Sequence, residues 1–315
     1  MSTISVVVAT YNGEKYIEEQ LDTLRNQTVN PDEVIIGDDG SSDNTVKIVK
    51  DYIVTHNLTS WKQIVNSRNK GYEKNFLDLT LGATGDYIFL CDQDDLWEVN
   101  KIEKMSRILD EDNSISLLCS NLELFYDGEG GRKWDKKDLT AMKNDGSIEK
   151  NEFNYLNFFC QRSGCTMCVR GMFVHSIMPY WKNYWAHDDF IWKMAVLNGK
   201  CAIFHFASIK RRMHANNTSS MNIRTRKWRI EQIKKQLEQY QSFKEYGKKL
   251  NVPIEKINII EDNVSCAKLR IQLLEKRNPL IWVKIFRKYK HCYPRVQAII
   301  LDLYLILFSQ YKGVN

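Results

Sequence analysis

The chain has 315 residues, a formal net charge of +6 and eight cysteines. This length allows one or two domains with a substantial core, and neither a repeat nor a low-complexity segment is visible. No apolar run reaches the ~20 residues that a transmembrane helix needs, which argues against an integral membrane protein. Eight cysteines without an export signal indicate free thiols in a reducing, cytoplasmic compartment.

Strands and helices are predicted to alternate over the first 110 residues. The run Ile4–Thr10 has the composition of a buried strand, and Tyr11-Asn12-Gly13 follows as a turn. The next segment is an amphipathic helix that carries Tyr16, Ile17, Leu21 and Leu24 on one face. Further strands are expected at 33–37, 61–66, 86–91, 117–125 and 199–205, and further helices at 44–53, 96–109 and 190–197. This alternation predicts an α/β fold with a mostly parallel, Rossmann-like central sheet and flanking helices.

Polar clusters follow three of the predicted strands. They are Thr10-Tyr11-Asn12, Asp38-Asp39 and Asp92-Gln93-Asp94-Asp95. Ligands of such sheets bind where the carboxyl ends of the strands meet. The three clusters therefore predict a nucleotide site at one edge of the sheet.

The stretch Asp92-Gln93-Asp94-Asp95 carries the most specific chemistry. Three carboxylates at a strand end repel one another and are costly to desolvate, so a cation is expected beside them. Oxygen ligands favour Mg²⁺ or Mn²⁺, and Mg²⁺ commonly joins one or two carboxylates to substrate phosphates. The alternative is an acidic turn that caps the helix predicted at 96–109, a role for which Asp95 is the best candidate.

Together these motifs resemble family-2 glycosyltransferases of the GT-A fold. The resemblance spans roughly residues 3–220. It rests on Ala9-Thr10-Tyr11-Asn12-Gly13, Asp38-Asp39-Gly40-Ser41-Ser42-Asp43, Asn69-x-Gly71-x-x-x-Asn75 and Asp92-Gln93-Asp94-Asp95-Leu96-Trp97, in that order. Within the family the chain is most similar to bacterial rhamnosyltransferases of cell-wall and surface polysaccharide assembly. That likeness rests on the last of these motifs, Ser163-Gly164-Cys165-Thr166-Met167, His187-Asp188 and Arg212-x-His214-x-x-Asn217.

The resemblance implies a set of donor-binding residues. Asp39 matches the acid that recognises the base, and Asp94 is expected to bind Mg²⁺ or Mn²⁺ directly. The further nucleotide contacts are Thr10, Tyr11, Asn12, Arg68 and Asp92, with Lys70 a weaker candidate. Asp92 and His214 complete the expected metal ligands, and Arg211 and Arg212 are expected at the diphosphate.

A general base must also activate the acceptor hydroxyl. The resemblance assigns this role to Asp188, which lies just before the helix predicted at 190–197, with Asp189 as the alternative. Either carboxylate can instead cap that helix. The residues expected to shape the acceptor pocket are Trp97, Gly164, Cys165, Thr166 and His187.

The implied activity is that of a metal-dependent inverting glycosyltransferase. The expected donor is dTDP-β-L-rhamnose, and the expected acceptor is a hydroxyl of a growing or lipid-linked surface polysaccharide. One alternative keeps the fold and uses UDP-glucose, UDP-galactose or a UDP-amino sugar. The other is a nucleotide-sugar-binding protein without catalysis.

The chain is predicted to divide near residue 220. Residues 1–110 form the nucleotide-binding half and residues 111–220 the acceptor half of the catalytic domain, with a polar loop at 126–146. Residues 221–315 are expected to form an α-helical region. Its regularly spaced apolar residues are interpreted as core: Trp228, Ile233, Leu237, Tyr240 and Phe243.

Charge is distributed unevenly between the two parts. Residues 1–204 carry 22 Lys and Arg against 31 Asp and Glu, whereas residues 205–315 carry 23 against 8. The basic part, with aromatic and basic residues alternating over Trp282–Lys290, suggests an anionic partner. No nucleic-acid motif is present, so the expectation is peripheral contact with the inner face of the cell membrane. A solvated surface, or packing against the catalytic domain or a second subunit, are the alternatives.

Overall fold

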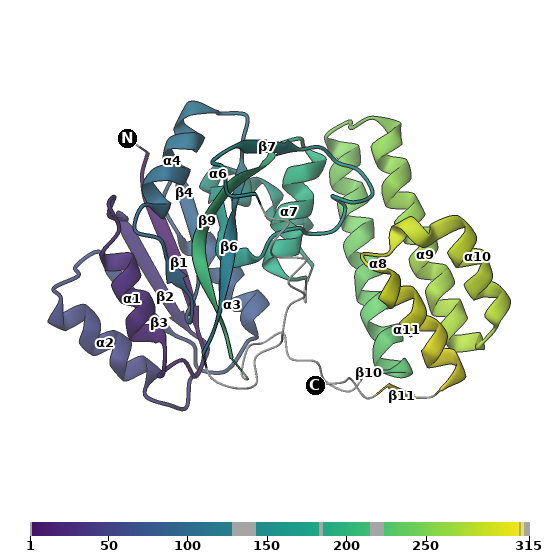
Figure 1. The fold of residues 1–315 in the computed structure, drawn as a ribbon, viewed down its shortest axis with the longest axis horizontal. Helices are drawn as coiled ribbons and strands as arrows, with labels where there is room; N and C mark the ends of the chain where they lie inside the picture. Colours follow the sequence, from purple (N-terminus) through teal and green to yellow (C-terminus); the bar gives the residue numbers. More distant parts are fainter. Residues whose placement is uncertain (1, 128–142, 183–184, 215–223, 309, 312–315) are drawn as a thin grey trace.

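A computed structural model describes residues 2–127, 143–182, 185–214, 224–308 and 310–311. A nine-stranded central sheet occupies one end of the molecule, and a group of long helices occupies the other (Figure 1). The strands of this sheet are β1 (Ile4–Thr10), β2 (Glu33–Asp38), β3 (Trp61–Val65), β4 (Tyr87–Asp92), β5 (Leu96–Trp97), β6 (Leu117–Tyr126), β7 (Ile148–Asn151), β8 (Met167–Arg170) and β9 (Cys201–Met213).

The strand order is β3-β2-β1-β4-β8-β6-β9-β5, with β7 paired to β9. Strands β1 to β4 pair in parallel, and so do β6 and β9. Strand β8 runs antiparallel between β4 and β6, and the short strands β5 and β7 are antiparallel to β9. The predicted α/β fold with a mostly parallel sheet is confirmed.

Helices cover both faces of the sheet because successive strand residues point to opposite sides. On β1, Val6 and Val8 face one core and Val7 faces the other. The first core also contains residues of α1 (Ile17–Arg25), α2 (Thr45–Thr55) and α4 (Lys101–Glu111). The second core contains residues of α3 (Tyr72–Gly82), α6 (Gly171–Ile177) and α7 (His187–Leu197). Short 3₁₀ helices lie between these elements or in the helical region: η1 (Gly164–Thr166), η2 (Met178–Tyr180) and η3 (Lys290–Cys292).

The helical region consists of α8 (Arg226–Lys249), α9 (Ile254–Lys276), α10 (Pro279–Tyr289) and α11 (Val296–Leu307), with a small sheet of β10 (Arg224–Thr225) and β11 (Gln310–Tyr311). Its apolar side continues the second core, where Phe243 packs edge-on against Phe153. Ile233, Tyr240 and Phe243 are buried as expected, whereas Trp228 is 38% exposed. The boundary predicted near residue 220 lies outside the described residues, as does most of the predicted loop at 126–146.

One predicted helix was wrong at its start. Residues 96 and 97 form β5, which pairs with Lys210 and Ile209 of β9, and α4 begins only at Lys101. The residue before α4 is Asn100, so Asp95 does not cap this helix. Local sequence favoured a helix here, but pairing with β9 is a contact with residues more than 110 positions away. None of the described helices is long and apolar enough to cross a membrane.

Candidate active site

The loops that follow β1 and β4 are joined at the carboxyl edge of the sheet. Gln93 accepts a hydrogen bond from the backbone N–H of Tyr11 at 2.8 Å and donates one to the Tyr11 carbonyl at 3.0 Å. Gly13 leaves room for this side chain, because a Cβ at that position would lie 2.3 Å from Gln93 Oε1. The first and third polar clusters of the sequence therefore form one rim.

The loop that follows β2 belongs to the same rim. Thr10 Oγ1 donates to Asp38 at 3.0 Å, and Asn12 Oδ1 accepts from the Ser42 N–H at 2.9 Å. Asn12 has a φ of 48°, a left-handed conformation that Asn tolerates better than most residues. The side chains of Thr10 and Asn12 thus hold the loops together, whereas Tyr11 is 47% exposed.

Asp39 is nearly fully buried and accepts hydrogen bonds from three N–H donors of the described residues. Its carboxylate binds the backbone N–H groups of Lys70 and Gly71, each at 2.9 Å, and the Asn66 amide at 3.1 Å. These donors lie after β3, where Arg68 is exposed. The ammonium of Lys70, the weaker candidate for a donor contact, pairs with Asp78 on α3 at 3.2 Å.

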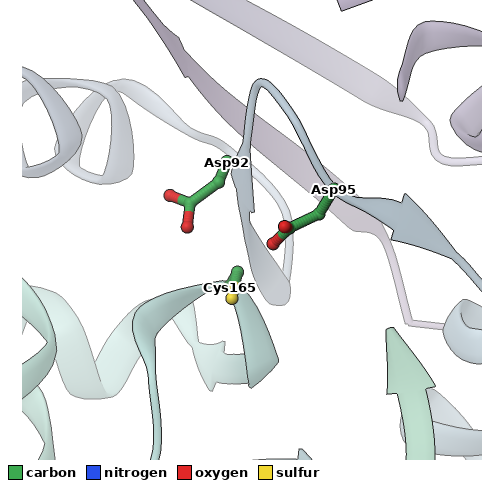
Figure 2. Close-up of side chains that lie close together, drawn as sticks. All are labelled: Asp92, Asp95 and Cys165. Atoms are coloured by element: carbon green, nitrogen blue, oxygen red, sulfur yellow. The ribbon is translucent and has the colours of Figure 1, made fainter. Parts of the chain in front are cut away.

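Two carboxylates of the third cluster meet a thiol across the rim. Asp92 and Asp95 stand on either side of the turn between β4 and β5, and both face Cys165 of η1 (Figure 2). One potential ligand atom from each residue lies within 4.8 Å of the others. Burial and neighbouring aspartates, Asp94 for Asp92 and Asp92 for Asp95, raise the pKa of Asp92 to about 6 and that of Asp95 to about 8.

Asp94 contacts the residue that the resemblance proposed as its partner. Asp94 Oδ2 and His214 Nε2 are 2.8 Å apart, although 120 positions separate the two residues. The imidazole also packs against the ring of Tyr16, with centroids 4.8 Å apart. His214 lies directly after β9, so the end of this strand brings it to the aspartate turn.

The two arginines of β9 have different surroundings. Arg211 donates to Ser163 Oγ at 2.8 Å and lies within electrostatic range of Asp92, Asp94 and Asp95. Arg212 instead donates to the Asp94 carbonyl at 3.0 Å and to Glu19, while its guanidinium lies over the rings of Tyr16 and Phe125. Alternation along a strand explains this difference. Arg211 faces the carboxylates, and Arg212 ties the aspartate turn to α1.

Asp188 and Asp189 lie in the first turn of α7, which begins three residues earlier than predicted. Asp189 accepts from Trp185 Nε1 at 2.7 Å and pairs with Lys193. Asp188 receives only the N–H of Asp189, at 2.8 Å, and has no side-chain partner among the described residues. Neither is the N-cap, which is Ala186. Asp188 therefore keeps acceptor capacity, and it lies within electrostatic range of Asp92.

Beside Asp188 lies a buried histidine with unused ring nitrogens. His187 is 5% exposed and stacks on Phe76, and neither ring nitrogen has a hydrogen-bond partner among the described residues. A Cβ at Gly164 would lie 2.6 Å from His187 Nε2, so only glycine fits there. Burial lowers the pKa of His187, which favours the neutral imidazole.

The remaining acceptor candidates are held by contacts within the protein. Trp97 is buried in the first core beneath the ammonium of Lys101, and Thr166 donates to the Ser163 carbonyl at 2.7 Å. The structure thus brings Gly164 against His187 and Cys165 beside Asp92 and Asp95, whereas Trp97 belongs to the first core and the Thr166 hydroxyl is bound within η1.

Two further residues of this region escaped sequence reasoning. Tyr72, at the start of α3, is 45% exposed, and partial burial together with the carboxylates Glu73, Asp188 and Asp92 raises its pKa. Lys101 is fully buried and donates to the Cys165 carbonyl at 2.8 Å. Tyr72 follows the Asn69-x-Gly71 motif directly, a signal that could have identified it. No local pattern marks Lys101, because its partner is 64 residues away.

The carboxylates fit a hard divalent cation. One oxygen of Asp95, Oδ2, is buried without a hydrogen-bond partner among the described residues, and the two other aspartates of this turn, Asp92 and Asp94, lie close to it. Oxygen ligands of this kind suit Mg²⁺ and Mn²⁺, whereas the Cys165 thiol is a soft ligand that suits neither.

The sheet, its aspartate rim and the carboxylate of α7 define a nucleotide-sugar-dependent glycosyltransferase of the GT-A fold. Residues 5–182, more than half of the chain, match the family described as glycosyl transferase family 2. The chain belongs to this family, and the resemblance drawn from its motifs is confirmed.

Three similar proteins place the chain among its relatives. It is 30% identical to the dTDP-rhamnosyl transferase RfbG of Shigella flexneri over 229 residues, 69% of this chain and 74% of RfbG. The fold is similar to that of S. aureus TarS 1–349 solved with UDP-GlcNAc, with a TM-score of 0.63, 20% identity, and coverage of 97% of this chain and 87% of TarS 1–349. It is also similar to that of the mannosyltransferase PcManGT from Pyrobaculum calidifontis, solved with GDP-Man and Mn²⁺. The TM-score is 0.56 and the identity 14%, and the match covers 98% of this chain and 87% of PcManGT.

Proposed function

We propose that this glycosyltransferase moves L-rhamnose from dTDP-β-L-rhamnose to a hydroxyl of a growing or lipid-linked surface polysaccharide. The observation that carries the proposal is the meeting of Arg211, the carboxylates of Asp92 and Asp94, and the uncommitted carboxylate of Asp188 at one edge of the sheet. The relationship to a dTDP-rhamnosyl transferase over 69% of the chain supports rhamnose as the sugar.

Donor binding is assigned to the rim. Asp39, which already accepts from three N–H groups, is proposed to accept the imide N–H of thymine or uracil. Tyr11 and Arg68 line the same edge, and Arg211 is proposed at the diphosphate. Arg212 is less suited to that role, because its guanidinium is already held by Glu19 and by the Asp94 carbonyl.

Asp94 and Asp92 are proposed to hold Mg²⁺ or Mn²⁺, with His214 beside Asp94 as a further ligand or as a positioning group. A bound divalent ion supplies Lewis-acid stabilisation of the leaving diphosphate. The mannosyltransferase solved with Mn²⁺ supports the use of such an ion within this fold.

Asp188 is proposed as the general base. It takes the proton of the acceptor hydroxyl as that oxygen attacks the anomeric carbon, and the diphosphate departs from the opposite side. This single displacement inverts the anomeric centre and needs no protein nucleophile. His187 and Gly164, which meet next to Asp188, are proposed to shape the acceptor pocket. The place of action is proposed to be the cytoplasm, close to the inner face of the membrane.

A donor screen tests the proposal. The purified protein is incubated with Mg²⁺ or Mn²⁺, a saccharide acceptor, and in turn dTDP-β-L-rhamnose, UDP-glucose, UDP-galactose and UDP-N-acetylglucosamine. Release of nucleoside diphosphate is measured together with the mass of the product. We expect turnover with the rhamnose donor, and an Asp188→Asn variant shows that this turnover belongs to the enzyme. Turnover with only a UDP-sugar assigns the alternative donor, and binding of a donor without any turnover assigns a non-catalytic role.

A further inference from the structure

The outer helices of the helical region expose an unusual amount of apolar surface. On α10, Leu280 is 75% exposed and Val283 and Phe286 are close to half exposed. On α11, Val296, Ile300 and Leu307 are each more than half exposed. Spacings of three, four and seven residues put the members of each set on or near one face of their helix. Neighbouring apolar side chains of this kind mark an interaction surface.

These two faces belong to adjacent helices at the end of the molecule away from the sheet (Figure 1). Trp282 of α10 donates its indole N–H to the Ile299 carbonyl of α11 at 3.1 Å, and both helices pack on α9. The inward side of α11 is buried at Ile299, Asp302 and Leu305. The exposed side of α11 is therefore distinct from the side that packs on α9. We call the exposed sides of α10 and α11 together the outer helical face.

Positive charge accompanies this apolar surface. Residues 276–315 contain eight Lys and Arg and one acidic residue, Asp302. Asp302 is fully buried and bound by Arg229, Arg270 and Tyr293, so it contributes no negative charge to the surface. Seven of the cations are exposed and form no ion pair with the described residues: Lys276, Arg277, Lys284, Arg287, Lys288, Lys290 and Arg295.

Helix α10 combines both properties. Lys284 and Arg287 lie on the same side as Leu280 and Val283, and no acidic residue occurs on the helix. Apolar residues beside lysine and arginine are typical of helices that lie in the plane of a bilayer, with the apolar groups in the acyl boundary and the cations at the headgroups. None of the described helices can span a membrane, so contact would be lateral.

We propose that the outer helical face docks on an anionic lipid bilayer. A second copy of the chain is the weaker occupant, because a twofold contact through this face would bring its cations against one another. A bilayer with anionic headgroups satisfies the cations and the apolar residues together. This docking is independent of the sugar transferred. A chain that failed in the donor screen could still bind vesicles, and a rhamnosyltransferase could fail to bind them.

Flotation of the intact protein with lipid vesicles tests the proposal. We expect binding to vesicles of 30% phosphatidylglycerol in phosphatidylcholine, little binding to pure phosphatidylcholine, and release as salt rises. Each Lys or Arg near an anionic surface contributes about a fivefold factor in partitioning. A variant with Lys284→Gln, Arg287→Gln and Lys288→Gln should therefore bind about 100-fold more weakly. A second variant, Leu280→Ser with Ile300→Ser, should also lose binding while its charge is unchanged.

Matched variants keep the result interpretable. Lys47→Gln, Lys50→Gln and Arg107→Gln remove the same charge from exposed helix positions of the sheet domain, and vesicle binding should persist. Helical content by circular dichroism should be the same in all variants. The proposal is overturned if the intact chain stays unbound at low salt, or if the matched variant loses binding equally. It is also overturned if the chain sediments as a dimer that Leu280→Ser with Ile300→Ser converts to a monomer.

Discussion

Adjacent carboxylates at the start of α7 show how surroundings separate two chemically identical side chains. Asp189 is occupied by the Trp185 indole and the Lys193 ammonium, so its removal leaves a buried ammonium without its partner. Asp188 has no such commitment and lies near Asp92. The carboxylate of Asp189 thus stabilises the fold, whereas that of Asp188 remains able to accept a proton or a hydrogen bond from a ligand.

Replacing Asp188 with Asn keeps the shape of the side chain and removes the base. Turnover should fall about 10²–10⁴-fold, the range that general acid–base catalysis contributes, while donor affinity is unchanged. Initial rates and donor titration measure the two effects. Asp189→Asn is the control, and we expect it to lower thermal stability more than turnover. If Asp189→Asn abolishes turnover in a protein of unchanged stability, the base is Asp189.

Asp94→Ala should abolish metal-dependent transfer and leave the fold intact, because Asp94 is the proposed direct ligand and lies on a turn outside both cores. Activity is measured with Mg²⁺, with Mn²⁺ and after treatment with a chelator, and circular dichroism checks the fold. Full activity of chelator-treated wild-type enzyme would contradict the metal role. Arg211 would then be the residue that places a positive charge opposite the carboxylates.

At the scale of elements, β9 organises the site. Its alternation directs Arg211 toward the carboxylates and Arg212 toward Glu19, Tyr16 and the aspartate turn. The backbone N–H of Arg212 also donates to Asp95 at 3.1 Å, which holds the turn from a second side. Arg211 of this strand therefore faces the proposed ligand site, whereas Arg212 stabilises the aspartate turn.

Arg211→Lys and Arg212→Lys should consequently fail in different ways. Arg211→Lys should raise the KM for the donor, because a point charge replaces a planar fork at the diphosphate. It should cost less stability than Arg212→Lys, because Arg211 gives up its bond to Ser163, whereas Arg212 gives up bonds to both Glu19 and the Asp94 carbonyl. Arg212→Lys should lower stability by about 1.5–3 kcal/mol, the range for hydrogen bonds to charged groups. Donor kinetics and thermal unfolding of the two variants separate the roles. Equal losses of stability would contradict the division.

At the scale of the whole molecule, the helical region is joined to the catalytic sheet through the second core and has its own buried ion cluster. Asp302 of α11 accepts from Arg270 of α9 at 2.6 Å, from Arg229 of α8 at 3.0 Å and from Tyr293 at 2.9 Å. Burial raises the pKa of Asp302, but Arg270 and Arg229 outweigh it, and the net pKa lies below the ordinary value. This residue ties α8, α9 and α11 together.

Asp302→Asn should destabilise the protein by about 3–5 kcal/mol at neutral pH, because the buried Arg270 and the partly buried Arg229 lose their counter-charge. The contribution of Asp302 is fully present above the unfolded-state carboxyl pKa of about 3.9 and is lost as pH falls through the lower folded-state pKa. The stability difference between wild type and variant should therefore shrink below about pH 4. Denaturant unfolding between pH 3 and pH 7 measures it, and a difference independent of pH would contradict the ionised state.

Much of the fold and the rim followed from sequence. Buried strands alternating with amphipathic helices defined the parallel sheet, and polar clusters directly after β1, β2 and β4 had to meet because parallel strands end at one edge. The pairing of His214 with Asp94 and the partly free Asp188 agree with that prediction, although the roles of these residues stay predictions. Local periodicity was sufficient here, since each motif lies within a few residues of a strand end.

The remaining features depended on contacts between distant residues. Pairing with β9 made residues 96 and 97 a strand and buried Asp95, against the local preference for a capped helix. Lys101 lies against η1, and His187 against Gly164, only because η1 and β8 fold back beside β4 and α7 packs on α3. The sequence by itself determined which side chains reach the edge of the sheet. Only tertiary packing decided which of them remain available to a ligand, because a neighbour that is distant in sequence occupies the others.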